Sequence, residues 1–447
     1  MRVASTSDSY LDHFHRARFS GVAVTIIGLT AGLTLTLSSQ SVALPASGIA
    51  INEQTGAVYL VSDGALTPTF NVASARLLLA RKELETSHSV SRSEPAAEPV
   101  LVSDATIRGA RLTTGRRTGI PDAPDMLPTK EQRLDSAHAA WGLCEAEGRT
   151  TVLAGLDGRK PELGIPLGDD EVLLVHGPDL ADQLVYRQGG KVVRARVSRG
   201  VRSAWNLTGT ASRNVGAALL DLIPEVPELS VPPADDVFRT DDFNGRERYW
   251  VVAGGDTHRV TEAVAQLISR SVPSRLTITD GVGDWADTAH YPDLPPRPAL
   301  DTDKVCVEWT RTGANVYTGA APSLGVRVDM PGAQDFVMPA GRAAVVRNGR
   351  FGAITLVTDH GVAHTVPNLL TAQVLGLAEP DENRIPEAPA ALLKLLPTGT
   401  QLDISKASCS YDVGREPAAS TPPVALPVSQ RVIARTPRER RAPSSQC

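Results

Sequence analysis

The sequence has few aromatic residues, no excess of basic residues and no catalytic signature. Phe, Trp and Tyr make up 4% of its 447 residues, and its formal net charge is −5. Proteins that bind nucleic acid usually present a basic patch to the phosphates. The charge balance therefore argues against a nucleic-acid partner.

The motif that marks a nucleotide site is also missing. A phosphate-binding loop needs a glycine-rich turn, a lysine, a Ser or Thr hydroxyl for magnesium, and a helix directly behind it. The nearest match, Gly189-Gly190-Lys191, is followed by Val192 and by strand-like residues. No G-x-S-x-G turn marks a nucleophilic serine either. We therefore expect no catalytic residue and no cofactor, which favours a protein that is not an enzyme.

Two clusters have some features of metal sites but lack others. His360 and His364 have the i, i+4 spacing of zinc ligands on a helix, yet they flank a predicted hairpin turn. Asp241, Asp242 and Asn244 lack the rest of a calcium loop. We interpret both clusters as turns and expect no metal.

The N-terminal stretch predicts a membrane anchor. Residues 1–18 are polar and are expected in the cytoplasm, and residues 19–37 carry no charge. A helix over this run rises about 28 Å, just enough to cross a bilayer. We expect a transmembrane helix over 19–40, with residues 41–414 exported. A signal peptide cleaved after the small-x-small site Ser41-Val42-Ala43 is the alternative.

Beyond the anchor, a β-hairpin followed by a helix recurs. The clearest copy has apolar residues at 58–61, a turn at Asp63-Gly64 and a returning strand over 65–70. Asp-Gly suits a type I′ turn, because both central residues of that turn need positive φ. Asn71 is a favourable N-cap for the helix that follows. One such unit cannot bury both its sheet face and its helix stripe alone.

Three further copies have turns at Gly189-Gly190, Gly254-Gly255 and His360-Gly361. The second copy is looser, because its helix is expected at 211–223, after an insertion. Uneven spacing excludes a stacked solenoid of fixed period. The apolar stripes of the helices either form the core or dock onto a neighbouring subunit. The expected repeats cover about 53–82, 183–223, 246–272 and 351–378.

The segments between the repeats differ in composition. Residues 119–128 contain three prolines and predict an extended bracing segment. Residues 273–350 predict a central β-rich module, and the Pro/Ser/Arg-rich residues 415–447 predict a disordered tail. The predicted fold class is α/β, of the α+β kind: one transmembrane helix, then an elongated exported domain of β-β-α modules around the central module.

Several short stretches of the exported part form a specific set. They are ASARLLL in the first repeat, GIPDAPDMLP at 119–128, WGLC at 141–144, CVEW at 306–309, PAGRAAVV at 339–346, LVTDHGVAHTVP at 356–367 and LLPTGTQLD at 395–403. In this order they resemble the EccB family, the single-pass membrane component of the actinobacterial type VII (ESX) secretion system. The resemblance covers about residues 49–403. The N-terminus departs from it, because the family usually has a longer and more basic cytoplasmic segment.

The resemblance implies one covalent link. Four cysteines, Cys144, Cys306, Cys409 and Cys447, allow three full pairings. Cys144 and Cys306 both fall in stretches that match the family, and the resemblance implies that they form a disulfide. Two independent buried thiols are the alternative. Cys409 and Cys447 are additional, and Cys447 is expected either free or paired with another chain.

The resemblance also implies a function, partners and a location. A member of this family would be a structural core component of the secretion complex, scaffolding or gating protein export at the outer side of the inner membrane. Its partners would be EccC, EccD and EccE-like subunits, further copies of itself and, indirectly, the exported substrates. The N-terminus would be cytoplasmic and the bulk of the chain periplasmic. Two alternatives stay open: an ATP-hydrolysing subunit, as parts of the family are labelled, and an exported cell-wall-associated binding protein.

Overall fold

The part of the chain that the structure describes begins at residue 43 and ends at residue 411. The structure is a computed structural model, and the described residues are 43–87, 97–134, 140–146, 148–156, 163–241, 245–271, 277–278, 294–319, 335–348, 352–379 and 385–411. The predicted anchor at 19–37 and the predicted tail at 415–447 lie outside them. Within the described ranges, no helix is long and apolar enough to cross a membrane.

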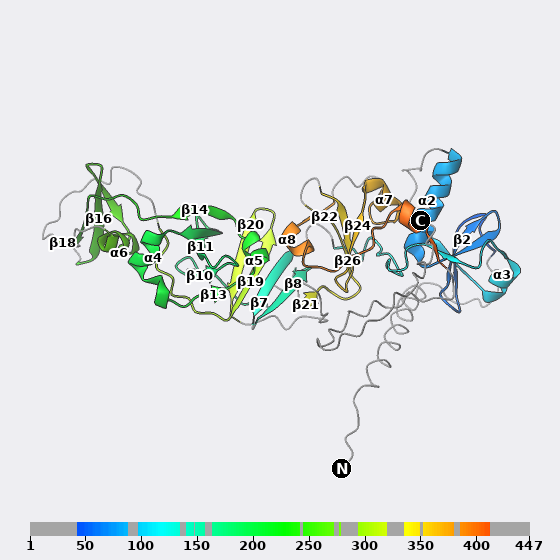
Figure 1. Ribbon diagram of the computed structural model, residues 1–447, viewed down its shortest axis with the longest axis horizontal. Helices are drawn as coiled ribbons and strands as arrows, with labels where there is room; N and C mark the ends of the chain where they lie inside the picture. Colours follow the sequence, from blue (N-terminus) through cyan, green and yellow to red (C-terminus); the bar gives the residue numbers. More distant parts are fainter. Residues whose placement is uncertain are drawn as a thin grey trace, which may run out of the picture.

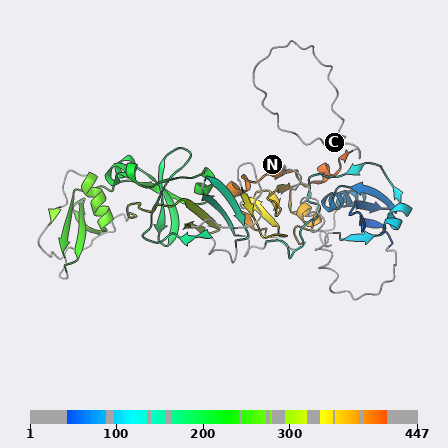
Figure 2. The same ribbon diagram turned by 90° about the horizontal axis from the view of Figure 1, so that it is seen from below.

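The molecule is a narrow rod of five β-sheets in a row (Figure 1). We name these sheets, with their helices, the first, fourth, central, second and third modules, in the order in which they follow along the rod. Figure 2 shows the same row from below. The expected mixed α+β architecture, rich in sheet, is confirmed.

The first and fourth modules lie next to each other at one end of the rod (Figure 1). The first contains β1 (Ser47–Asn52), β2 (Val58–Ser62), β3 (Ala65–Thr69), α2 (Val72–Ser87), β4 (Pro99–Val102), α3 (Asp104–Gly109), β5 (Arg111–Leu112), β6 (Arg117–Thr118), α9 (Ile404–Ala407) and β27 (Ser410–Tyr411). The fourth contains β22 (Ala344–Asn348), β23 (Ile354–Val357), β24 (Ala363–Val366), α7 (Leu369–Val374), β25 (Glu387–Ala388), α8 (Ala390–Leu393) and β26 (Thr398–Gly399).

The remaining modules complete the rod. The central module contains β7 (Trp141–Ala146), β8 (Arg149–Ala154), β9 (Ile165–Pro166), β19 (Lys304–Thr310), β20 (Gly313–Thr318) and β21 (Asp335–Val337). The second contains β10 (Leu173–His176), β11 (Asp182–Gln188), β12 (Lys191–Val197), α4 (Arg199–Trp205), η2 (Leu207–Gly209), β13 (Arg213–Asn214), α5 (Ala217–Asp221) and β14 (Glu225–Leu229). The third contains β15 (Asp236–Asp241), β16 (Glu247–Ala253), β17 (Asp256–Val260), α6 (Glu262–Ser271) and β18 (Thr277–Ile278).

Chain order and spatial order differ along this rod. The chain starts in the first module, supplies β7 and β8 to the central sheet, and builds the second and third modules at the far end. It then returns through β19 to β21 of the central sheet and through the fourth module. Its last described strand, β27, pairs with β6 at the edge of the sheet in which β1 lies. Both ends of the described chain are therefore in the first module.

Four of the five sheets share one topology. Each has three consecutive antiparallel strands, of which the last two form the predicted hairpin, and a helix follows directly. Each also gains at least one outer strand that runs parallel to its edge. The repeating unit thus begins one strand before the hairpin that the sequence pattern picks out.

The first hairpin forms for the reasons that its sequence suggests. Asp63 and Gly64 have φ values of 51° and 71°, the positive pair that a type I′ turn requires. The backbone N–H of Ser74 donates to Oδ1 of Asn71 at 2.9 Å, so Asn71 caps α2 as predicted.

The structure corrects two of the expected boundaries. The central sheet takes β7 to β9 in addition to later strands, whereas β22 at Ala344–Asn348 belongs to the fourth module and not to a module ending at 350. In the second repeat, α4 follows the hairpin directly, and the expected helix at 211–223 shortens to α5, Ala217–Asp221. Short apolar runs reveal strands but not their distant partners, which explains the first error.

Hydrophobic clusters cross the boundaries between the modules. One cluster joins the central module to the second and fourth, and includes Trp141, Leu219 and Leu392. Another joins the first and fourth modules through Leu77 and Leu356. A third joins the second and third modules through Trp205 and Leu267. Each junction of the rod is therefore a shared core.

Candidate functional site

The proline-rich segment 119–128 connects the first module to the fourth. It forms neither helix nor strand. Asn71 of α2 donates to the carbonyls of Ile120 and Ala123 at 2.7 and 3.2 Å, and the Oγ of Ser74 accepts the Ile120 N–H at 2.8 Å. A Cβ at Gly119 would lie 2.4 Å from the Cβ of Ser74, so only glycine allows this approach. The segment acts as the brace that its composition suggests.

Two arginines clamp the C-terminal end of α7. Arg76 of α2 donates from Nη1 to the carbonyl of Leu375 at 2.5 Å, and Arg133 donates from Nη1 to the carbonyl of Leu377 at 2.5 Å. Arg133 also pairs with Glu379 at 3.1 Å. Burial lowers the pKa of Arg76, but a cation at the negative end of a helix dipole is favourable. The Arg76 contact fastens the first module to the fourth, and the Arg133 contacts fasten the loop that follows residues 119–128.

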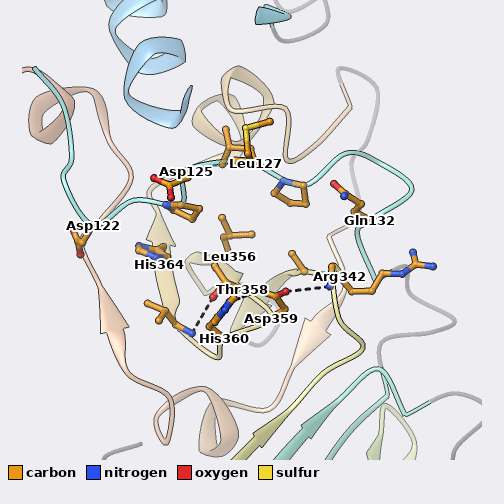
Figure 3. A pocket seen from close by; sticks show the side chains of 16 residues that line it. Asp122, Asp125, Leu127, Gln132, Arg342, Leu356, Thr358, Asp359, His360 and His364 are labelled. Atoms are coloured by element: carbon orange, nitrogen blue, oxygen red, sulfur yellow. Dashed lines mark hydrogen bonds and ion pairs between the residues drawn. The ribbon is translucent and has the colours of Figure 1, made fainter. Parts of the chain in front are cut away.

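A cavity of about 440 Å³ lies between the brace and the β23–β24 hairpin. Figure 3 shows Asp122 and Asp125 at one side of it, and Gln132 and Arg342 at the other. Its apolar lining comes from the brace (Pro124, Met126, Leu127, Pro128) and from Ala343, Leu356 and Val362.

The two histidines that the sequence singles out both line this cavity but have different environments. The side chain of His360 is 77% exposed on the turn, and its Nδ1 lies 2.6 Å from Oδ1 of Asp359. That hydrogen bond raises the pKa of His360 and lowers the pKa of Asp359. His364 is buried, with Nδ1 donating to the carbonyl of Thr400 at 3.1 Å.

His364 is therefore a core residue rather than a free ligand. Its ring packs directly against Gly399, where an added Cβ would lie 2.2 Å away. Among the described residues, no three His, Cys, Asp or Glu side chains are grouped to hold a metal ion. Asp241 is the last residue of β15, and Asp242 and Asn244 lie outside the described ranges.

Cys144 and Cys306 are joined by a disulfide in the central sheet. The two residues lie directly opposite each other on β7 and β19, with Cα atoms 4.0 Å apart, and both are buried. The bond links the outgoing path of the chain to its returning path, 162 residues later. Closing a loop of this length contributes about 5 kcal/mol in the chain-entropy account. Cys409 is disulfide-bonded as well, and Cys447 lies outside the described residues.

A second cavity, of about 650 Å³, lies where the central sheet meets α5 and α8. The Glu145 carboxylate faces it and accepts the Gly216 N–H with both oxygens at 3.0 Å. Burial raises the pKa of Glu145, although the hydrogen bond from Gly216 and the charge of Arg213 oppose the shift. A Cβ at Gly216 would lie 2.8 Å from Oε1, so a larger residue there would displace the end of the Glu145 side chain.

The Gly189-Gly190-Lys191 stretch is a hairpin turn. Gly189 and Gly190 have φ values of 57° and 76°, and Gln188 pairs with Lys191 across the turn. Lys191 is exposed, Val192 is buried, and the chain continues as strand β12. A phosphate loop would open into a helix at this point.

The family comparison decides the identity of the chain. The family model described as "Type VII secretion system ESX-1, transport TM domain B" matches residues 4–414. The chain belongs to the EccB family of type VII secretion proteins. This confirms the resemblance seen in the sequence, and the match includes residues 19–37 of the predicted anchor.

Relatives of this EccB chain have modest sequence identity. It is 24% identical over 365 residues to "ESX-3 secretion system ATPase EccB3" of Mycolicibacterium smegmatis, covering 71% of this chain and 66%, just under two thirds, of the relative. It is 25% identical over 463 residues to "ESX-5 secretion system ATPase EccB5" of Mycobacterium tuberculosis, covering 88% of this chain and 86% of the relative.

Solved structures share the fold of this EccB chain. The periplasmic assembly from the ESX-5 inner membrane complex aligns with a TM-score of 0.60 and 22% identity, covering 87% of this chain and 99% of that one. The EccB3 dimer from the ESX-3 core complex aligns with a TM-score of 0.56 and 21% identity, covering 81% of this chain and 99% of that one.

Some residues of this EccB site could not be found from sequence. Asn71 and the brace carry clear local signals, a cap position and three prolines. Arg76 and Arg133 do not, because an arginine on a helix or in a loop is usually a solvated residue. Their partners, Leu375 and Leu377, lie 299 and 244 residues away.

Proposed function

We propose that this chain is an anchored structural component of a type VII secretion complex in the inner membrane, with its rod on the outer side. The observation that carries the proposal is the out-and-back path of the chain, which brings both described ends to the first module. β1 starts at Ser47, close behind the uncharged run 19–37. A single anchor at 19–37 would thus hold the rod by its first module.

The shared cores and the clamps of Arg76 and Arg133 support a scaffolding role. A linker between independent domains would let them rotate, whereas a continuous apolar core resists bending. A stiff rod can hold partner subunits at set distances from the membrane. Its modules, four of them of one topology, offer similar surfaces at successive distances.

We infer from the family that the partners are the other membrane subunits and further copies of this chain. One related structure belongs to an intact ESX-5 inner membrane complex and another is an EccB3 dimer. By the same reasoning, EccC, EccD and EccE-like subunits are the expected neighbours, and exported substrates are contacted indirectly.

Fractionation of cells that make the tagged full chain tests the proposal. We expect the chain in the membrane fraction after carbonate extraction, with its tag digested by protease added to spheroplasts and its original N-terminus intact. We also expect it to co-purify with other secretion subunits. A reporter with a cleaved signal peptide serves as control. A mature protein that starts near Leu44 and appears in the medium would instead favour an exported binding protein.

ATP hydrolysis is the second candidate function, because relatives carry "ATPase" in their names. We expect Lys191→Ala to leave phosphate release and complex assembly within error of the unchanged chain, because the exposed lysine follows a strand-reversing turn. Phosphate release by the purified full chain, with and without the change, is the measurement. Loss of ATP hydrolysis on this one substitution would instead support the view that the chain is an ATPase.

A further inference from the structure

Three side chains of the second module are arranged like a nucleophile and its base. His176 ends β10 and Asp182 begins β11, directly opposite it in the antiparallel register. Ser212 precedes β13, whose Asn214 pairs with His176 on the other side. Nε2 of His176 lies 2.8 Å from the Oγ of Ser212, and Nδ1 lies 2.9 Å from Oδ1 of Asp182. The two contacts use opposite nitrogens of one imidazole.

Exposure to solvent decreases from Ser212 through His176 to Asp182. Ser212 is exposed, the side chain of His176 is 24% exposed, and that of Asp182 is 4% exposed. Nε of Arg202 donates to Oδ2 of Asp182, which fixes the carboxylate behind the ring. Nδ1 of His176 is close enough to Asp182 for a hydrogen bond but is not aligned for one. Catalytic hydrogen bonds commonly become aligned only when substrate binds. The Ser212 hydroxyl is thus accessible to solvent, whereas the Asp182 carboxylate next to the imidazole is buried.

We propose that Ser212 is an activated nucleophile for acyl esters, with His176 as its general base and Asp182 as the residue that positions the imidazole. The Oγ attacks the ester carbonyl carbon while its proton passes to Nε2 of His176. The bond from carbon to the alcohol oxygen then breaks, and that oxygen takes the proton from Nε2. Water releases the acyl group from Oγ by the reverse sequence, so no oxidant or further reactant is needed.

The loop between the base and the carboxylate indicates the kind of acyl group. Leu180 in this loop has a φ of 56°, a conformation that is unfavourable for leucine, and the residue is 72% exposed. An exposed apolar residue in the loop that joins His176 to Asp182 favours an ester with an apolar acyl group. This activity goes beyond the scaffolding role and does not depend on it.

Labelling of the full chain in detergent with a fluorophosphonate probe tests the assignment. We expect one adduct, mapped by peptide mass spectrometry to Ser212, and none in Ser212→Ala. His176→Gln should slow labelling by about 100-fold or more, the usual contribution of a general base. Ser230→Ala, at another exposed serine, is the matched control and should label like the unchanged chain.

Two cysteine variants keep the test independent of how His176→Gln folds. Ser212→Cys should react with iodoacetamide at least tenfold faster than Ser230→Cys, after subtraction of the background of the unchanged chain. Faster release of nitrophenolate from p-nitrophenyl butyrate than from the acetate ester would support the apolar acyl group. No adduct, an adduct that persists in Ser212→Ala, or equal alkylation of the two cysteine variants would overturn the proposal.

Discussion

At the scale of single residues, Glu145 places a carboxylate where its charge is unfavourable. Burial raises its pKa above the ordinary value of 4.5, so the folded protein holds the proton more tightly than the unfolded chain does. The contribution of this group to stability is therefore greatest below pH 4.5 and is lost as the pH rises through the folded-state pKa. What keeps the residue in place is the pair of hydrogen bonds from Gly216.

We expect Glu145→Gln to remove this dependence. The amide keeps an oxygen for the Gly216 N–H but carries no charge, so unfolding at pH 7 should need at least as much denaturant as in the unchanged chain. The difference in the free energy of unfolding between the two proteins should vanish near pH 4. Urea melts at both pH values measure it.

Glu145→Ala serves as the contrasting variant for this residue. It leaves the Gly216 donor without its acceptor and should cost about 1–3 kcal/mol at either pH. A Glu145→Gln protein that loses more stability at pH 7 than at pH 4 would show instead that the negative charge itself is needed.

Residues with local signals were predictable from the sequence, and residues with distant partners were not. The Asp63-Gly64 turn and the cap that Asn71 forms on α2 involve neighbours within three positions, so turn and cap chemistry reveals them. His176, Asp182 and Ser212 meet through strand pairing over as many as 36 positions. The Cys144–Cys306 pairing came from family resemblance, because cysteine count alone allows three pairings.

At the scale of elements, the hairpins were predictable and the outer strands were not. Glycine-rich turns recur at each hairpin, but the strands that complete each sheet are as short as two residues, as in β13 and β25. Two residues carry no periodicity. Their position is decided by the parallel edge that they join, so tertiary pairing and not local propensity forms them.

In the second repeat, an insertion caused the helix to be predicted at the wrong position. Residues 211–223 contain enough apolar positions for a helix, yet they hold β13, Ser212 and the short α5. Gly216 interrupts them as the N-cap of α5, with extended backbone and its N–H donated to Glu145. The helix that matches those of the other repeats is α4, which starts directly after the hairpin with Ser198 as its N-cap.

At the scale of the whole molecule, the shared cores couple neighbouring modules. Leu77 of α2 is fully buried in the cluster that also contains Leu356 and Val366 of the fourth module. Leu267 of α6 holds the equivalent position in the cluster that joins the second and third modules. A change that destabilises one module should therefore also destabilise the module with which it shares a core.

Leu77→Ala should loosen the fourth module as well as the first. Removing a buried leucine costs about 2–5 kcal/mol, and the cavity would open into the cluster that the two modules share. Hydrogen exchange followed by mass spectrometry should show faster exchange in peptides that cover both β2–β3 and β23–β24. Leu267→Ala, a matched change in the other cluster, should accelerate exchange in the second and third modules and leave those peptides unchanged. If Leu77→Ala accelerates exchange in the first module alone, the modules are independent domains, and the stiffness that the scaffolding role requires is absent.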